Sequence, residues 1–155
     1  MVNNDVLRSI RYALDLSDAK VVEIIHLAGH EAALSDIQDF LRKEEEEGFA
    51  ECGDTVMEAF LDGLIVHRRG KLEAPPEQAA RKKARLTNNV ILKKLRVAFA
   101  LKEADMHAIL ESAGFGVSKP ELSALFRAKG HNNYRACGDQ LLRNFLKGVV
   151  ARYRA

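Results

Sequence analysis

One set of residues has the types that nucleophilic catalysis uses. Cys137 lies within a few positions of His131 and Asp139, and a thiolate next to a histidine is a common nucleophile. A nearby helix N-terminus would also lower the pKa of the thiol. However, Cys52 occupies the matching position in the first half of the chain, where Glu46 stands in place of the histidine. The sequence therefore favours buried structural thiols, and we expect no enzymatic activity.

A second set has types and spacing that could bind a metal. Glu23, His26 and His30 could lie on one face of a helix, as ligands of a zinc ion do. Gly29 is expected to end that helix before His30, and no Cys-x-x-Cys pair is present to add ligands. No glycine-rich loop ending in Gly-Lys-Ser/Thr is present either. We therefore expect neither a metal nor another cofactor.

Nucleic-acid binding is better supported, because basic and aromatic side chains gather in the second half of the chain. Lys and Arg contact phosphates, and aromatic rings or imidazoles stack on bases. The residues that we predict to bind an anionic ligand are Lys93, Lys94, Arg127, Lys129, His131, Asn132, Tyr134, Arg135 and Arg143.

The charges of the two halves have opposite signs. Residues 1–70 hold 7 Lys or Arg and 15 Asp or Glu, a net charge of −8, whereas residues 71–155 hold 17 and 7, a net charge of +10. The largest local difference replaces "RKEEEEGF" of the first half by "RAKGHNNY" in the second. Gly130 is predicted to end a helix early there. The resulting loop, residues 130–139, is a candidate functional segment.

The positions of all these residues are set by an internal repeat. Shifting the sequence by 85 residues aligns residues 3–70 with the second half without a gap, and one register over that length indicates a duplicated unit. Identical pairs include Asn3/Asn88, Leu7/Leu92, Arg11/Arg96, Gly29/Gly114, Cys52/Cys137, Gly53/Gly138, Asp54/Asp139, Phe60/Phe145, Gly63/Gly148 and Arg69/Arg154. Shared residues are expected to serve folding, and residues that differ are candidates for function.

Each unit is predicted to contain four helices, because its apolar residues recur at helical spacing and no segment alternates as a strand does. Asn3 or Asn4 is expected to cap the first helix and Ser17 the second. The stretch Ser118–Glu121 is a capping box with Pro120 in the first turn. The predicted fold is all-α, with two tandem four-helix repeats related by a pseudo-two-fold axis. Its parts are an acidic repeat (1–70), a linker (71–87) and a basic repeat (88–155).

Two shared features predict specific contacts. Gly63 and Gly148 lie inside predicted helices, where glycine costs about 1 kcal/mol relative to alanine, so we expect another helix to cross closely, at the contact between the repeats. Arg11 and Arg96 lie in otherwise apolar stretches. We expect each to pair with the aspartate of the Cys-Gly-Asp motif in its own repeat.

Several segments carry a family resemblance. "NNDVLRSIRYALDLSD", "EEEEGFAECGDTVMEAFLDGL", "TNNVILKKLRVAF" and "SKPELSALFRAKGHNNYRACGDQLLRNFLKG" resemble the YehS-like proteins of gammaproteobacteria, which are built on a duplicated domain of unknown function. The resemblance covers essentially the whole chain. It implies a cytosolic bacterial protein, and it supplies no catalytic residues because the family has no established activity.

Two classes of function stay open. The first is a non-enzymatic binding module whose basic repeat contacts an anionic ligand, RNA or DNA. The second is a protein-interaction or regulatory module that uses its dipolar surface to bind an acidic partner or to form a homodimer. The start of the chain has no apolar signal core, and no stretch approaches the roughly 20 apolar residues that span a bilayer. We therefore expect a cytoplasmic protein without membrane contact.

Overall fold

The computed structural model describes residues 2–70 and 86–154, and within these ranges the secondary structure consists of eight α-helices without a strand. The first four are α1 (Asn3–Ala13), α2 (Asp18–Leu27), α3 (Leu34–Phe40) and α4 (Asp54–Arg69). The other four are α6 (Asn88–Ala98), α7 (Glu103–Ser112), α8 (Lys119–Leu125) and α9 (Asp139–Arg154). Each helix of the second set begins and ends 85 residues after its counterpart. The all-α class and the two four-helix repeats are confirmed, and the predicted linker lies mostly outside the described residues.

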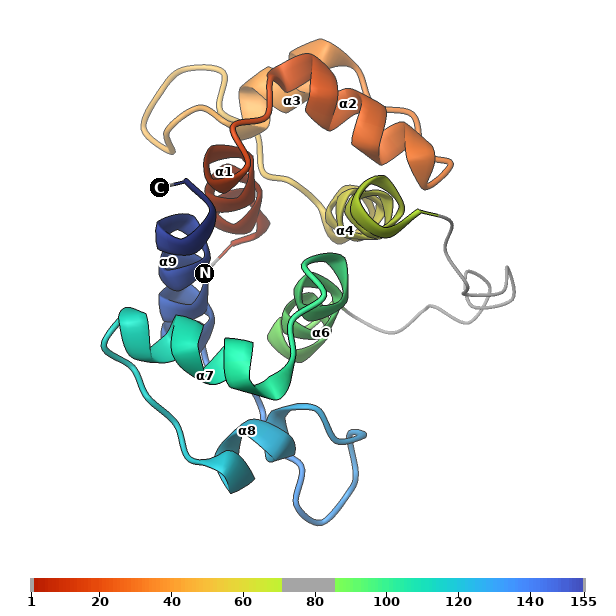
Figure 1. Cartoon of the computed structure of the whole chain (residues 1–155). Helices are drawn as coiled ribbons and strands as arrows, with labels where there is room; N and C mark the ends of the chain where they lie inside the picture. Colours follow the sequence, from red (N-terminus) through yellow and green to blue (C-terminus); the bar gives the residue numbers. More distant parts are fainter. Residues whose placement is uncertain (1, 71–85, 155) are drawn as a thin grey trace.

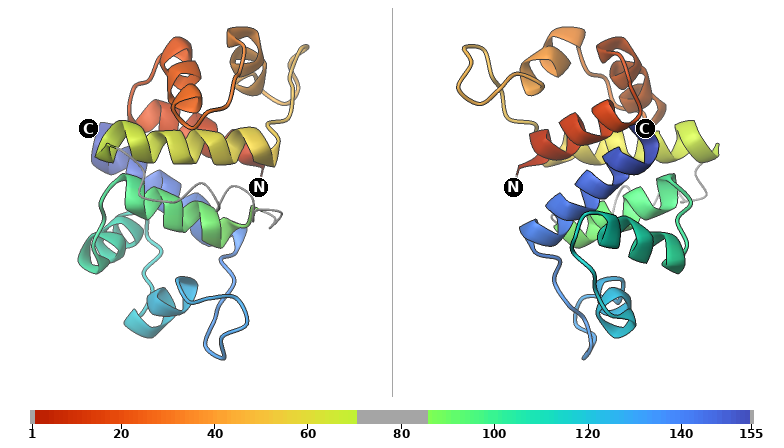
Figure 2. Two further views of the ribbon diagram at one scale, coloured as in Figure 1. Left: turned by 90° about the vertical axis from the view of Figure 1, so that its right-hand side faces the viewer. Right: turned by 60° about the vertical axis from the view of Figure 1, so that its left-hand side comes forward.

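The repeats are joined through their first and last helices. α1 packs against α9 and α4 packs against α6, so the first helix of each repeat lies on the last helix of the other. These four helices form a central layer. Figure 2 shows α2 and α3 of the N-terminal repeat on one side of it and α7 and α8 of the C-terminal repeat on the opposite side. α2 packs on α4 in one repeat, and α7 packs on α9 in the other. These reciprocal pairs obey the predicted pseudo-two-fold symmetry.

The core is continuous from one repeat to the other. Its largest fully buried side chains include Phe60 and Phe145, which are 85 positions apart, together with Leu and Ile residues of both repeats. Burying one such side chain contributes about 1.5–3 kcal/mol. The shared apolar positions of the repeat therefore supply most of the stabilisation, as expected for residues that the unit needs in order to fold.

Helix starts agree with the sequence at two places and differ at a third. The Ser17 hydroxyl accepts a hydrogen bond from the amide of Lys20. The Ser118–Glu121 capping box forms as predicted, with Pro120 in the first turn. The prediction for α1 was wrong, because Val2 is its N-cap. Asn3 and Asn4 lie inside the first turn, and their side chains make longer-range contacts that are described below.

The two helical glycines mark close helix crossings, but within each repeat. A Cβ atom on Gly63 would lie 1.8 Å from the carbonyl oxygen of Ile24, and one on Gly148 would lie 2.3 Å from that of Ile109. α4 therefore crosses α2 at Gly63, and α9 crosses α7 at Gly148. The expected close approach is present, whereas its expected location between the repeats was wrong.

The loop after α8 also differs from its prediction. Gly130 does not end the third helix early, because α3 ends at Phe40 and α8 at Leu125, which are equivalent positions. The acidic segment 44–47 and its basic counterpart 129–132 both lie in the loop between the third and fourth helices. The two loops extend at opposite ends of the molecule (Figures 1 and 2).

Two arginines repeat the same contact across the repeats. Arg69, at the end of α4, donates to the carbonyl oxygen of Val97, and Arg154, at the end of α9, donates to that of Tyr12. Val97 and Tyr12 occupy equivalent positions near the C-termini of α6 and α1, where carbonyls lack helical partners and the helix dipole favours a cation. The final arginine of each repeat therefore holds the other repeat.

The glycine crossings predict a stability difference. Gly148→Ala should lower the free energy of unfolding by about 2–4 kcal/mol, because the new Cβ would force apart α9 and α7 and a backbone carbonyl cannot rotate away as a side chain can. Urea denaturation followed by circular dichroism measures this. Gly138→Ala is the matched control, because a Cβ there would meet nothing within 4 Å. Equal stability of the two variants would contradict the crossing.

Candidate functional site

The loops of both repeats are fixed by one asparagine each. Asn4 is fully buried; its Nδ2 donates to the carbonyl oxygens of Phe40 and Ala50, both at 2.9 Å, and its Oδ1 accepts from the amide of Cys52 at 2.9 Å. Asn89 makes the equivalent three bonds at 2.8–2.9 Å. One amide therefore ties the first helix to both ends of the loop that carries the charge difference.

The Cys-Gly-Asp motif contacts the neighbouring asparagine and not the arginine that we expected. Nδ2 of Asn3 donates to the carbonyl of Cys52 at 3.0 Å and to Asp54 Oδ1 at 2.9 Å. Asn88 repeats both bonds in the second repeat. Arg11 pairs instead with Asp18, at 3.0 Å.

Arg96 also lacks the expected contact with the motif. Its Nε donates to the carbonyl oxygen of Leu101 at 3.1 Å, and its guanidinium lies 4.6 Å from the centre of the Phe126 ring. The predicted pairing was therefore wrong in both repeats, because each arginine is used near the end of its own helix.

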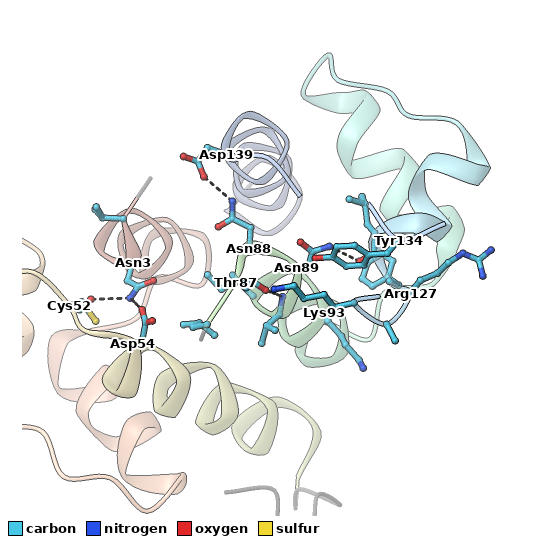
Figure 3. Close-up of a pocket in the computed structure, with 18 of the residues that line it drawn as sticks. Asn3, Cys52, Asp54, Thr87, Asn88, Asn89, Lys93, Arg127, Tyr134 and Asp139 are labelled. Atoms are coloured by element: carbon cyan, nitrogen blue, oxygen red, sulfur yellow. Dashed lines mark hydrogen bonds between the residues drawn. The ribbon is translucent and has the colours of Figure 1, made fainter. Parts of the chain in front are cut away.

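A pocket of about 1160 Å³ lies beside these motifs, where the N-terminal ends of helices from both repeats approach one another. Its walls come from the start of α1, the residues before α4, the start of α6 and the loop after α8 (Figure 3). Four of the predicted ligand-binding residues line it: Lys93, Arg127, Lys129 and Tyr134.

The cations of this pocket are not neutralised by the protein. Among the described residues, the side chains of Lys93, Arg127 and Lys129 have no hydrogen-bond or ion-pair partner. Lys93 projects from α6, and the other two follow α8. Unpaired cations make their own side of the pocket attractive to anions, while three carboxylates, Glu51, Asp54 and Asp139, line the same pocket. We call Lys93, Arg127 and Lys129 the cation wall.

The equivalent cations of the first repeat are neutralised. Arg8 corresponds to Lys93 and pairs with Asp5 at 3.3 Å. Arg42 corresponds to Arg127 and pairs with Asp39 at 3.2 Å.

The second repeat lacks both of these carboxylates. Val90 stands at the position of Asp5, and Ala124 stands at that of Asp39. Lys129 replaces Glu44. The same scaffold therefore presents self-neutralised arginines in one repeat and free cations in the other.

The other predicted site residues do not join the cation wall. Lys94 Nζ pairs with Asp62 Oδ1 at 2.6 Å across the contact between repeats, and Arg135 pairs with Glu121 at 2.9 Å. Arg143 donates to Gln140 Oε1 at 3.3 Å, one helical turn away. His131 and Asn132 lie in the exposed turn of the loop. These five residues do not line the pocket.

Sequence reasoning missed several polar residues of the pocket, Glu51 among them, and the absence of the counter-charges from the second repeat. Glu51, which belongs to the acidic repeat, also lines the pocket and forms no ion pair within the described ranges. A signal for the absent carboxylates was available, because Asp5/Val90 and Asp39/Ala124 stand opposite each other in the 85-residue register. In the first repeat each of these aspartates lies three residues before its arginine, which is the spacing of an ion pair on a helix.

The cysteines do not form a catalytic set with the loop residues. Burial, followed by the charge of Asp54, raises the pKa of Cys52 to about 12. Burial, followed by the charge of Asp139, raises the pKa of Cys137 to about 11. His131 Nδ1 accepts a hydrogen bond from the amide of Asn133, at 3.0 Å, instead of contacting the thiol. A neutral buried thiol is a poor nucleophile.

Neither a metal site nor a membrane-spanning helix is found within the residues that the structure describes. No cluster of three or more His, Cys, Asp or Glu side chains is placed to hold a metal ion. His26 lies 3.1 Å from Glu31, an exposed contact. Among the helices of residues 2–70 and 86–154, none combines the length and the hydrophobicity needed to cross a bilayer.

Comparisons with known proteins agree with the repeat. The family model described as "Protein of unknown function (DUF1456)" matches twice, over residues 3–70 and 88–155. The chain is similar to "Uncharacterized protein YehS" of Escherichia coli (strain K12), with 49% identity over 152 residues, covering 98% of this chain and 96% of the relative. No solved structure matches the chain.

The buried asparagine predicts a large effect from a small truncation. Asn4→Ala should lower the free energy of unfolding by about 2–4 kcal/mol, because it leaves two carbonyls and one amide without their partner. Chemical denaturation measures the loss. Asn133→Ala, which truncates an exposed side chain in the loop, should change stability by less than about 0.5 kcal/mol. A stable Asn4→Ala variant would contradict the role of this amide.

The raised thiol pKa values predict slow labelling and a loss of stability at high pH. A thiol reagent at neutral pH should label the folded protein far more slowly than free cysteine, and urea should restore normal labelling. An unfolded thiol has a pKa of about 8.5. The unfolded state therefore releases thiol protons first, and the unfolding free energy should fall as pH rises from about 9 through the folded-state values. Labelling as fast as that of free cysteine would contradict burial.

Proposed function

Because the chain belongs to the DUF1456 family, whose function is unknown, we propose a function from the pocket itself: a non-enzymatic module that binds nucleic acid through the basic repeat. The observation that carries this proposal is the cation wall: the residues equivalent to Lys93 and Arg127 are paired with carboxylates, and Glu44 stands in place of Lys129. Lysine and arginine that lack protein partners can contact phosphates without first breaking an ion pair.

The charges of the two loops favour a polyanion that reaches the pocket from the side of the C-terminal repeat. The basic loop and the acidic loop with segment 44–47 lie at opposite ends (Figure 2). A nucleic acid would therefore be attracted to the C-terminal repeat and repelled from the N-terminal one. The opposite charges of the two loops support this orientation, although the whole chain has a net charge of only +2.

The proposal predicts a salt-dependent loss of affinity in a double variant. Lys93→Ala with Arg127→Ala should weaken binding of a fluorescent oligonucleotide at least about tenfold at low salt, because two phosphate contacts are lost. The slope of log affinity against log salt should fall by about 0.7–0.9 for each contact. Fluorescence anisotropy over a series of KCl concentrations measures both quantities.

A charge-matched control separates this site from general electrostatics. Lys119 and Lys147 are exposed cations on α8 and α9 that do not line the pocket. Lys119→Ala with Lys147→Ala removes the same charge and should retain most of the affinity. If both double variants weaken binding equally, the cation wall is not the site. If the wild-type protein binds no oligonucleotide, the proposal is wrong, and self-association or an acidic protein partner becomes the function to test.

A further inference from the structure

The pocket is lined by cations of the basic repeat and by carboxylates of the acidic repeat. These opposite charges limit which form of nucleic acid, single-stranded or duplex, can bind there. Building on the proposed function, we infer that the pocket accepts one nucleotide of a single-stranded RNA or DNA and excludes a duplex. In this arrangement the phosphate contacts the cation wall and the base lies against Tyr134. The edge of the base faces Glu51 and the neighbouring carboxylate of Asp54.

The aromatic ring of Tyr134 is placed where a base could stack on it. Tyr134 lines the pocket and is half-buried (Figure 3). Among the described residues its ring has no aromatic or cation partner, whereas the ring of Phe126 in the same pocket is covered by Arg96 at 4.6 Å. An aromatic ring beside cations is the arrangement that stacks a base while its phosphate is bound. Tyr134 therefore provides the surface for the base.

Two carboxylates of the acidic repeat, Glu51 and Asp54, form what we call the carboxylate wall. Glu51 and Asp54 both line the pocket; Glu51 is exposed, and Asp54 accepts a hydrogen bond from Asn3. Figure 3 shows Asp54 on the opposite side of the pocket from Lys93 and Arg127. A carboxylate accepts hydrogen bonds from the amino groups of bases, as aspartate and glutamate do with cytosine. It repels phosphate, so the wall selects for a base edge.

A duplex cannot satisfy both walls. Its bases are paired and stacked inside, and phosphates line both of its strands, so a duplex on the cation wall would bring its second strand toward carboxylates. A single strand exposes the Watson–Crick edges of its bases and can turn one of them into a cavity. The volume of about 1160 Å³ is sufficient for a small organic ligand, which a mononucleotide resembles in size.

The test compares strands of identical sequence. Fluorescein-labelled RNA and DNA oligonucleotides of about 15 nucleotides, and the corresponding blunt duplexes, are titrated with the full chain at fixed salt. We expect single strands to bind at least about tenfold more tightly than duplexes. Equal or tighter binding of duplexes overturns the inference and leaves the proposed function standing. Absence of binding to any of the four probes overturns the proposed function itself.

Two substitutions test the two walls separately. Glu51→Gln should bring duplex and single-strand affinities closer together, whereas Glu47→Gln, on the remote acidic loop, should not. Tyr134→Leu should weaken single-strand binding roughly 5- to 100-fold with an unchanged salt slope, and Tyr134→Phe should retain affinity. Phe49→Leu makes the equivalent change in the acidic repeat and should leave affinity unchanged.

The set of variants distinguishes stacking from a loss of loop structure. Circular dichroism establishes whether Tyr134→Leu folds, and if it does not, the Glu51→Gln comparison decides. Unchanged affinity in a folded Tyr134→Leu protein overturns the stacking role. An unchanged ratio of single-strand to duplex affinity in Glu51→Gln overturns the selection by the carboxylate wall.

Discussion

A buried side-chain amide at the start of the first helix of each repeat is the constraint on which the remaining structure depends. Asn4 satisfies two carbonyls and one amide of the loop that leads into α4, and Asn89 does the same before α9. Buried polar groups without partners are costly, so these bonds hold the loop backbone in one conformation. Most side chains of the loop are then free to vary, because they are not needed to shape it.

This division between backbone and side chains explains how one scaffold carries two electrostatic surfaces. The helices of the repeats coincide in register to the residue, yet the loops differ from four consecutive glutamates to a segment with Lys129 and His131. Removal of the carboxylates beside Lys93 and Arg127 changes the surface without touching the core. Exposed ion pairs contribute little to stability, so the second repeat could lose them at small cost while gaining a positive potential.

Residue spacing in the sequence predicted the helices and two of their caps correctly, but it predicted poorly which side chains and helices contact one another. Helix number and the caps at Ser17 and Ser118 follow from interactions within one turn, which the sequence displays directly. The partner of Asp54 was wrong because Arg11 and Asn3 were both available on α1, and only the packing angle of α1 decides between them. Gly63 correctly indicated a close crossing, but no periodicity shows which helix crosses. The nine predicted site residues stay predictions, and four of them line the pocket. The sequence could not show which ones, because the pocket forms only where the two repeats meet.

The exchange of partners between the first and last helices has an evolutionary consequence. A solitary repeat would leave apolar faces of its first and last helices uncovered, and its terminal arginine would have no neighbouring helix end to bind. Two identical copies that associate symmetrically would cover these apolar faces and give each terminal arginine a helix end to bind. The arrangement is therefore that of a symmetric homodimer of single repeats, with both subunits contained in one polypeptide. The subunits of a symmetric homodimer must have identical surfaces, whereas two repeats in one polypeptide can differ.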